Sequence, residues 1–280
     1  MHGDIVDCVE IKKQLAFDHP LLKNHSLQMK PNFKVSMQRS TPSSSLVLTP
    51  SQLLPESMRC PKGTVPIKRI KEEDLAMEKF SPSFGTAFTT ANSSIIIDSS
   101  DGLTSVPQYA SLVSLTNNEG ASGNINVWNP EVATDQLSAA FVDVASDDGS
   151  LTNYISAGWA DLNTKNWWLF YGDEQVGYWP KELFSTLTNG AQRAGWGGEI
   201  SSPETEAAPA MGSGHFPEEG QSKASMIYGL TLYGAKGVPK KTDMQLALTK
   251  PDCYKAIDAG DSGGAFGYYM FFGGPPNCKL

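Results

Sequence analysis

The stretch Ala194-Gly195-Trp196-Gly197-Gly198-Glu199-Ile200 places three glycines, one tryptophan and one carboxylate within seven residues. In a β-strand the side chains alternate between two faces, so Trp196 and Ile200 would point to one face and Glu199 to the other. Two of the three glycines share the face of Glu199. Because glycine leaves room for another backbone to approach, we expect Glu199 to stand on an open surface over a floor of glycine. Trp196 is expected in the core.

The sequence on both sides of this stretch has the pattern of an antiparallel β protein. From residue 108 onward, short alternating segments are separated by turn sequences rich in Gly, Asn and Asp. Residues 180–187 are predicted to form a helix. Many short strands with few helices are typical of a β-sandwich or barrel. The expected strands lie at residues 108–115, 122–130, 138–146, 153–160, 166–172, 175–180, 193–200, 223–233 and 265–274.

The amino-terminal part of the chain differs from this body in composition. Residues 1–80 hold 12 Lys and Arg against 9 Asp and Glu, whereas residues 81–280 hold 10 against 21. Opposite net charges suggest two units that attract each other, with a difference in solvated surface as the plainer alternative. Residues 36–58 are predicted to be irregular, residues 71–80 helical, and the Ser- and Thr-rich residues 81–105 a linker. We therefore expect a small α+β segment at 1–80, a linker at 81–105 and a β domain at 106–280.

Composition excludes several classes of function. The formal net charge of −8 offers no basic face for nucleic acid. No apolar run approaches the roughly 18–20 residues that a membrane helix needs. The start of the chain has neither the basic nor the apolar region of a signal peptide, which predicts a cytosolic protein or a chain whose true start is missing.

The four cysteines fall in two pairs, one near each end of the chain. They have no C-x-x-C spacing, which argues against a zinc site. Two disulfides are the natural arrangement for a secreted protein, and four reduced cysteines in a cytosolic protein are the alternative. The candidate pairs are Cys8 with Cys60 and Cys253 with Cys278.

Two further motifs lack the partners that their chemistry needs. The segment 260–264 (GDSGG) resembles the nucleophile motif of serine proteases, but three of the four histidines lie within the first 25 residues and none has a matching context. A glycine loop before the last strand explains it better. The segment 215–219 (HFPEE) lacks a second histidine, and Pro217 breaks the helix that a metal site would need. We expect neither a metal nor a cofactor.

Glu199 alone supplies half of a hydrolytic mechanism. Hydrolysis by carboxylates needs one ionised group to activate water and a second group to protonate the leaving amine or to hold the oxyanion. A solvated surface carboxylate is the alternative role for this residue.

The chain resembles the neprosin family of plant glutamic peptidases over nearly its whole length. Segments 3–31 and 60–75 are similar to that family's activation peptide. Long idiosyncratic strings in the rest are similar to its catalytic domain, among them INVWNPEV (125–132), NTKNWWLFYGDEQVGYWPKELF (163–184), GWGGEI (195–200), MGSGHFPEEGQSKAS (211–225) and FFGGPPNC (271–278).

The resemblance implies a secreted zymogen whose mature part is an antiparallel β-sandwich that cleaves peptides after proline at acid pH. It implies a catalytic pair of glutamates, one of which corresponds to Glu199. It also implies that the activation peptide is docked in cis, and we expect a monomer that binds proline-containing peptide or protein substrates.

Two departures from the family pattern bear on activity. Ser156 stands at the position of the second catalytic glutamate, and an internal family segment is missing near residues 160–165. We therefore expect an inactive or severely impaired peptidase. Residual activity through a substitute carboxylate such as Glu218 or Asp143 is one alternative. A non-catalytic β-sandwich that binds proline-containing or cell-wall peptides is another, and an unstable remnant without function is a third.

Overall fold

The structure is a computed structural model, and it describes residues 5–32, 60–69, 97–98, 104–148, 152–156, 158–160, 163–172, 174–234, 239–240, 243–264 and 266–280. The expected irregular stretch at 36–58, the expected helix at 71–80 and most of the expected linker lie outside these residues. Within them, no helix has the length and apolar character required to cross a membrane.

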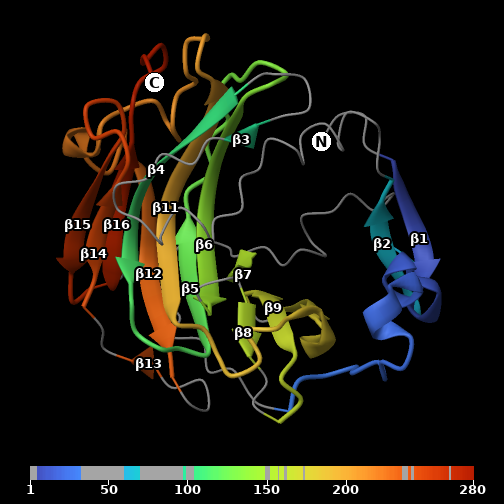
Figure 1. The fold of residues 1–280 in the computed structure, drawn as a ribbon. Helices are drawn as coiled ribbons and strands as arrows, with labels where there is room; N and C mark the ends of the chain where they lie inside the picture. Colours follow the sequence, from blue (N-terminus) through green and yellow to red (C-terminus); the bar gives the residue numbers. More distant parts are fainter. Residues whose placement is uncertain are drawn as a thin grey trace.

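The described residues form two large antiparallel sheets that pack into a β-sandwich (Figure 1), so the predicted fold class is confirmed. The six-stranded sheet has the order β14-β4-β11-β6-β7, with β3 (Ile97–Asp98) paired to β4. Its strands are β14 (Gln245–Leu248), β4 (Thr104–Ser114), β11 (Arg193–Pro203), β6 (Leu137–Asp147) and β7 (Thr152–Ser156).

The eight-stranded sheet has the order β10-β9-β8-β5-β12-β16-β15, with β13 (Pro239–Lys240) paired to β12. Two of its members, β15 (Lys255–Asp261) and the short β13, are strands that the sequence patterns did not predict. The others are β10 (Glu174–Trp179), β9 (Trp167–Tyr171), β8 (Gly158–Ala160), β5 (Gly120–Ile125), β12 (Ser225–Tyr233) and β16 (Tyr268–Gly273).

The core lies between the sheets, and β11 supplies its centre. Trp196 is fully buried and its indole N–H donates to the carbonyl oxygen of Ser122 on β5, at 2.9 Å. Burial of the ring thus leaves no unpaired donor. Gly198 lies where the sheets approach closely, because a Cβ atom there would come within 2.6 Å of the Phe272 ring. The predicted alternation of β11 is therefore correct for its core face.

Strand β4 accommodates a proline at a position where no backbone donor is needed. The backbone N–H of Tyr109 bonds Thr249, on the side of β4 away from β11. Pro107, two residues earlier, has its nitrogen on the same side by the period of the strand. Because β14 pairs only with residues 110–113 of β4, Pro107 interrupts no ladder bond.

The predicted helix at 180–187 is wrong. Only a single 3₁₀ turn forms there, η5 (Lys181–Leu183), and the backbone becomes extended at Phe184. The side chain of Asn153 accepts hydrogen bonds from the backbone N–H groups of Ser185 and Thr186, at 2.9 and 2.8 Å. These bonds fix an extended path because they replace the partners that a continuing helix would supply.

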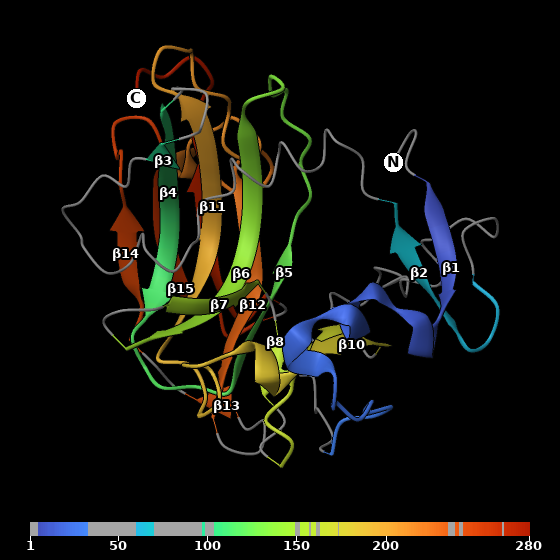
Figure 2. The ribbon, with the colours of Figure 1, turned by 45° about the vertical axis from the view of Figure 1, so that its right-hand side comes forward.

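The amino-terminal segment forms a small unit beside the sandwich. Strand β1 (Val6–Glu10) pairs with β2 (Thr64–Lys68), and the disulfide Cys8–Cys60 joins the two parts. Figures 1 and 2 show this two-stranded sheet apart from the large sheets, with the chain after β1 leading toward β8 and β10. That chain contains three 3₁₀ turns: η1 (Ile11–Lys13), η2 (Leu15–Asp18) and η3 (Pro20–Leu22).

The second disulfide, Cys253–Cys278, lies at the carboxyl-terminal end, so the cysteines pair as their positions suggested. The GDSGG segment ends β15 and forms the loop before β16, where the Asp261 carboxylate accepts from the backbone N–H of Gly263 at 2.8 Å. This is the glycine loop that the sequence favoured.

Candidate active site

Glu199 lies on β11, near the middle of the six-stranded sheet, on the face opposite Trp196. It pairs with Tyr109 of β4 and Ala139 of β6. The Tyr109 hydroxyl donates to Glu199 Oε1 at 3.1 Å. Only 2% of Glu199 and 3% of Tyr109 are exposed. The expectation of an open surface is therefore wrong: both faces of β11 are buried along its whole length, which strand alternation could not reveal.

The environment of Glu199 favours its neutral form. Burial raises its pKa to about 8, and the charge of Asp143 acts in the same direction, while the Tyr109 hydrogen bond acts against them. In this conformation Glu199 is a carboxylic acid at acid pH. A neutral carboxyl group cannot accept a proton from water, so the covered site is not in a form that can activate water as a base.

Asp143 of β6 is the second buried acid on this face. It pairs with Gly195 of β11, and 2% of it is exposed. Burial raises its pKa to about 7, opposed by the charge of Arg193 and by backbone hydrogen bonds from Gly195 and from Asp143 itself. Arg193 also forms an ion pair with Asp147, at 3.0 Å. The site therefore holds two buried carboxyl groups, and the charge of Asp143 disfavours ionisation of Glu199.

Two glycines of β11, Gly195 and Gly197, lie on the face of Glu199 and make room for different neighbours. A Cβ atom at Gly195 would overlap Asp143 Oδ1, so the missing side chain makes room for that carboxyl group. At Gly197 a Cβ atom would lie 2.6 Å from Ser111 Cα, so β4 approaches β11 closely there. Between the two acids β11 therefore carries no side chain of its own on this face, but the space above it is filled by Asp143 and Ser111.

The structure brings Asp143 into the site, but it does not bring Glu218. Glu218 lies on the 3₁₀ turn η6 (Pro217–Glu219), with an exposed side chain that pairs with Lys255 at 3.2 Å. Ser156 lies at the end of β7 and pairs with Asp143. Strand β6 thus separates the Ser156 position from β11.

Within the described part of the chain, no three His, Cys, Asp or Glu residues gather as a metal site would require. His215, which the HFPEE motif singled out, instead pairs with Glu219 at 3.0 Å on the surface.

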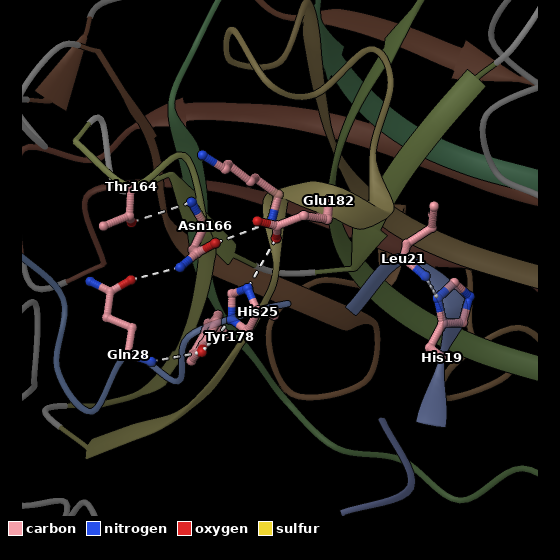
Figure 3. A network of polar contacts seen from close by, with 9 residues as sticks. His19, Leu21, His25, Gln28, Thr164, Asn166, Tyr178 and Glu182 are labelled. Atoms are coloured by element: carbon pink, nitrogen blue, oxygen red, sulfur yellow. Dashed lines mark hydrogen bonds and ion pairs between the residues drawn. The ribbon is translucent and has the colours of Figure 1, made fainter. Parts of the chain in front are cut away.

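The amino-terminal segment contacts the sandwich through a connected set of hydrogen bonds (Figure 3). His25 Nε2 lies 2.8 Å from the Tyr178 hydroxyl of β10, and His25 Nδ1 lies 3.1 Å from Glu182 Oε2 of η5. The backbone N–H of Gln28 donates to the same hydroxyl at 2.8 Å. Because that hydroxyl oxygen accepts from Gln28, its proton can be donated to His25 Nε2, which leaves Nδ1–H for Glu182. We call these four residues the latch.

Asn166 extends the latch toward β9. Its amide nitrogen donates to Gln28 Oε1 at 2.7 Å, and its carbonyl oxygen accepts from the backbone N–H of Lys181 at 3.1 Å. Leu22 is buried where η3 packs against η5. The segment is thus docked in cis by both polar and apolar contacts.

Sequence reasoning did not find Tyr109 or the latch. Both depend on pairing across more than 80 residues, for which a single sequence gives no register. The alternation of residues 108–115 could have placed Tyr109 on one face of a strand, but not opposite Glu199.

These features define a class of protein: a β-sandwich with a buried carboxyl site on one sheet, and an amino-terminal segment, closed by its own disulfide, that docks in cis against β10 and η5. The comparison with family models is more specific. The model described as Neprosin matches residues 132–275, and the model described as Neprosin activation peptide matches residues 1–112. The chain belongs to the neprosin family, which suggests a peptidase-like function, and its two disulfides fit an extracellular protein.

Proposed function

We propose that this chain is a secreted zymogen of the glutamic peptidase type, in which Glu199 is the remaining catalytic glutamate. Its substrates are proline-containing peptides, cleaved after proline at acid pH and far more slowly than by a complete pair of glutamates. The observation that carries the proposal is the position of Glu199: it is buried on a central strand, hydrogen-bonded by Tyr109, next to a stretch of β11 without side chains on that face.

Strand geometry supports a peptide as the substrate. An extended peptide can lie along a sheet face only where side chains do not block its path. Gly195 and Gly197 contribute no side chain of their own to such a path beside Glu199, and the path would be free once Asp143 and Ser111, which fill the space above them, moved aside. A folded protein substrate would have to offer an extended segment of this kind.

The serine at position 156 supports severe impairment. A serine hydroxyl does not act as an acid or base near acid pH, and the loss of a general acid or base costs about 10²–10⁴ in rate. If the missing glutamate also held the oxyanion, about 10²–10³ more would be lost.

The burial of the site supports the zymogen assignment. Glu199 is neutral at acid pH because it is removed from water. Release of the docked segment that admitted water to this face would lower its pKa and restore a carboxylate. The latch is the described contact that holds the segment to β10 and η5, so its opening would begin the release of the segment.

The test compares the full chain with Glu199→Gln on a proline-containing peptide at pH 3–5. Slow cleavage after proline by the wild type, absent in the variant, is expected. Equal background rates in both proteins would refute the proposed peptidase activity. If the peptide still bound the wild type in that case, a non-catalytic peptide-binding function would be the better proposal.

A further inference from the structure

We propose that Asp143 is the second carboxyl group of the Glu199 site and takes the place of the glutamate that is absent at position 156. This rests on the proposed function above. The structure supports it by position, by orientation and by charge. Glu218, the other substitute that the sequence offered, is instead exposed on η6 and paired with Lys255.

The position of Asp143 follows from strand register. Ser156 of β7 pairs with Asp143 of β6, and Asp143 pairs with Gly195 of β11, so the three residues form one row across the sheet. Directly paired residues in neighbouring strands have Cβ atoms about 4.5–5.5 Å apart. Asp143 therefore lies one strand nearer to β11 than position 156, in the same row.

The orientation of Asp143 is fixed by Gly195. The carboxyl group occupies the space that a Cβ atom of Gly195 would take, and the backbone N–H of Gly195 donates to it. The carboxyl group thus extends from β6 over the backbone of β11. Its Oδ1 atom is buried, and no described residue gives it a hydrogen-bond partner. A buried acceptor of this kind is costly to leave unpaired, and a substrate amide or a water could satisfy it.

Charge links Asp143 to Glu199 across this bare backbone. The two residues are four positions apart along the paired strands, which corresponds to about 13 Å between their rows before the side chains lean together. The negative charge of Asp143 nevertheless disfavours ionisation of Glu199. The intervening position on β11 is Gly197, which carries no side chain, and Ser111 of β4 closes over it. A water and an extended peptide would therefore reach the space between the two acids only once this buried face opens.

Other ionisable groups near the pair come from β11, β6 and the neighbouring strand β4. Arg193 favours the charged form of Asp143 and is itself paired with Asp147, and Tyr109 donates to Glu199. Because a charged Asp143 disfavours ionisation of Glu199, a state in which Asp143 is ionised and Glu199 keeps its proton is favoured over a state in which both are ionised. A pair with one proton contains both a base and an acid.

Hydrolysis by such a pair is balanced. The ionised carboxyl takes a proton from water while the water oxygen bonds to the carbonyl carbon of the scissile peptide. The protonated carboxyl then gives its proton to the leaving nitrogen as the C–N bond breaks. The products are a carboxylic acid and an amine, and exchange with water returns the proton to the second carboxyl.

The experiment measures cleavage of a proline-containing peptide from pH 3 to 7 by the full chain and its variants. Asp143→Asn should reduce kcat/KM to the level of Glu199→Gln, and the double variant should lose no more. Glu218→Gln is the matched control and should retain the wild-type rate. If Asp143→Asn kept the wild-type rate while Glu199→Gln lost it, the role of Asp143 would be refuted and the proposed function would stand.

Two further measurements separate chemistry from structure. A purely structural role would lower the rate of Asp143→Asn equally at every pH, whereas a titrating partner would change the shape of the pH profile. The titration of Glu199 followed by carboxyl ¹³C NMR needs no turnover and should move to lower pH in Asp143→Asn. An unmoved titration would overturn the pairing even if the wild type proved inactive. If Asp143→Asn fails to fold, Asp143→Ser serves in the same assays.

Discussion

His25 of the amino-terminal segment and Tyr178 of β10 lie 2.8 Å apart, from ring nitrogen to hydroxyl oxygen, although 153 residues separate them. The same hydroxyl accepts from the backbone of Gln28, and the other ring nitrogen of His25 contacts Glu182. One tyrosine side chain therefore holds two points of the docked segment. This makes Tyr178 the position at which docking can be weakened with the smallest change.

Tyr178→Phe should loosen the segment without unfolding the sandwich. The change removes two hydrogen bonds, and each is worth about 0.5–1.5 kcal/mol net. The two bonds together are worth about 1–3 kcal/mol, so the open population of residues 19–28 should rise about fivefold to 150-fold. Hydrogen exchange of these residues at neutral pH measures that population.

The control for this variant is Tyr171→Phe on β9, a tyrosine that is 48% exposed. It removes the same atom outside the latch, and exchange should remain at the wild-type level. Equal protection of residues 19–28 in both variants would show that the latch does not hold the segment.

The buried acids should make the protein less stable as pH rises. Their pKa values in the folded state, about 7 for Asp143 and about 8 for Glu199, lie above the ordinary values of 3.8 and 4.5. Between about pH 4 and 8 the folded protein therefore holds protons that the unfolded chain has released, and this contribution to stability falls as pH rises through that window. Urea unfolding from pH 4 to 8.5 should show this decline.

Glu199→Gln should flatten the decline, because glutamine does not ionise. A tenfold difference in proton affinity is worth about 1.4 kcal/mol. Between pH 4 and pH 8 the free energy of unfolding should therefore fall by about 1 kcal/mol or more less in the variant than in the wild type. Glu218→Gln is the control: the pKa of Glu218 is lowered, first by its own backbone N–H, so its removal cannot flatten a decline at pH 5–8. An unchanged profile in Glu199→Gln would mean that Glu199 is already ionised in the folded protein at neutral pH.

Gly198→Ala should destabilise the sandwich by overpacking its core. The added methyl would lie 2.6 Å from the Phe272 ring and 2.8 Å from Met211 Cγ, in a region with no exposed surface to receive it. Overpacking of this kind costs about 1–3 kcal/mol. Thermal or urea unfolding measures the loss.

The comparison for this variant is Gly177→Ala on β10, where a Cβ atom would have nothing within 4 Å. That change should leave stability within about 0.5 kcal/mol of the wild type. If both alanine variants unfolded at the same urea concentration, the close approach of the two sheets at Gly198 would be wrong.

Local patterns predicted the features that depend on alternation within one strand. The core position of Trp196 and the shared face of Glu199 with the β11 glycines follow from a period of two, and the structure agrees. The helix predicted at 180–187 failed because the partner that redirects the backbone, Asn153, is distant in sequence. Its apolar spacing gave no sign of that bond.

The candidate site was predictable only in part for the same reason. Glu199 was found from its glycine-rich context, and Asp143 was one of two substitutes considered. Their placement on one face depends on the register of β6 against β11, and the bond from Tyr109 depends on the register of β4. The burial of Glu199 is a tertiary property of the whole sheet face, so no local pattern could indicate it.

Ser156→Glu tests the missing glutamate and the role of Asp143 together. The new carboxyl group would stand directly opposite Asp143, and like charges at paired positions destabilise a sheet. Because the pKa of Asp143 is raised to about 7, Asp143 is neutral at pH 4 and largely charged at pH 8. Ser156→Glu should therefore lower the melting temperature more at pH 8 than at pH 4. Ser156→Gln supplies a side chain of the same size without the charge, and should shift the melting temperature equally at both pH values.

At pH 4, where the charge conflict is absent, Ser156→Glu should also raise the rate of peptide cleavage above the wild type. A destabilisation independent of pH would mean that position 156 does not face the Asp143 carboxyl, and the row that links the absent glutamate to Asp143 would then lose its support.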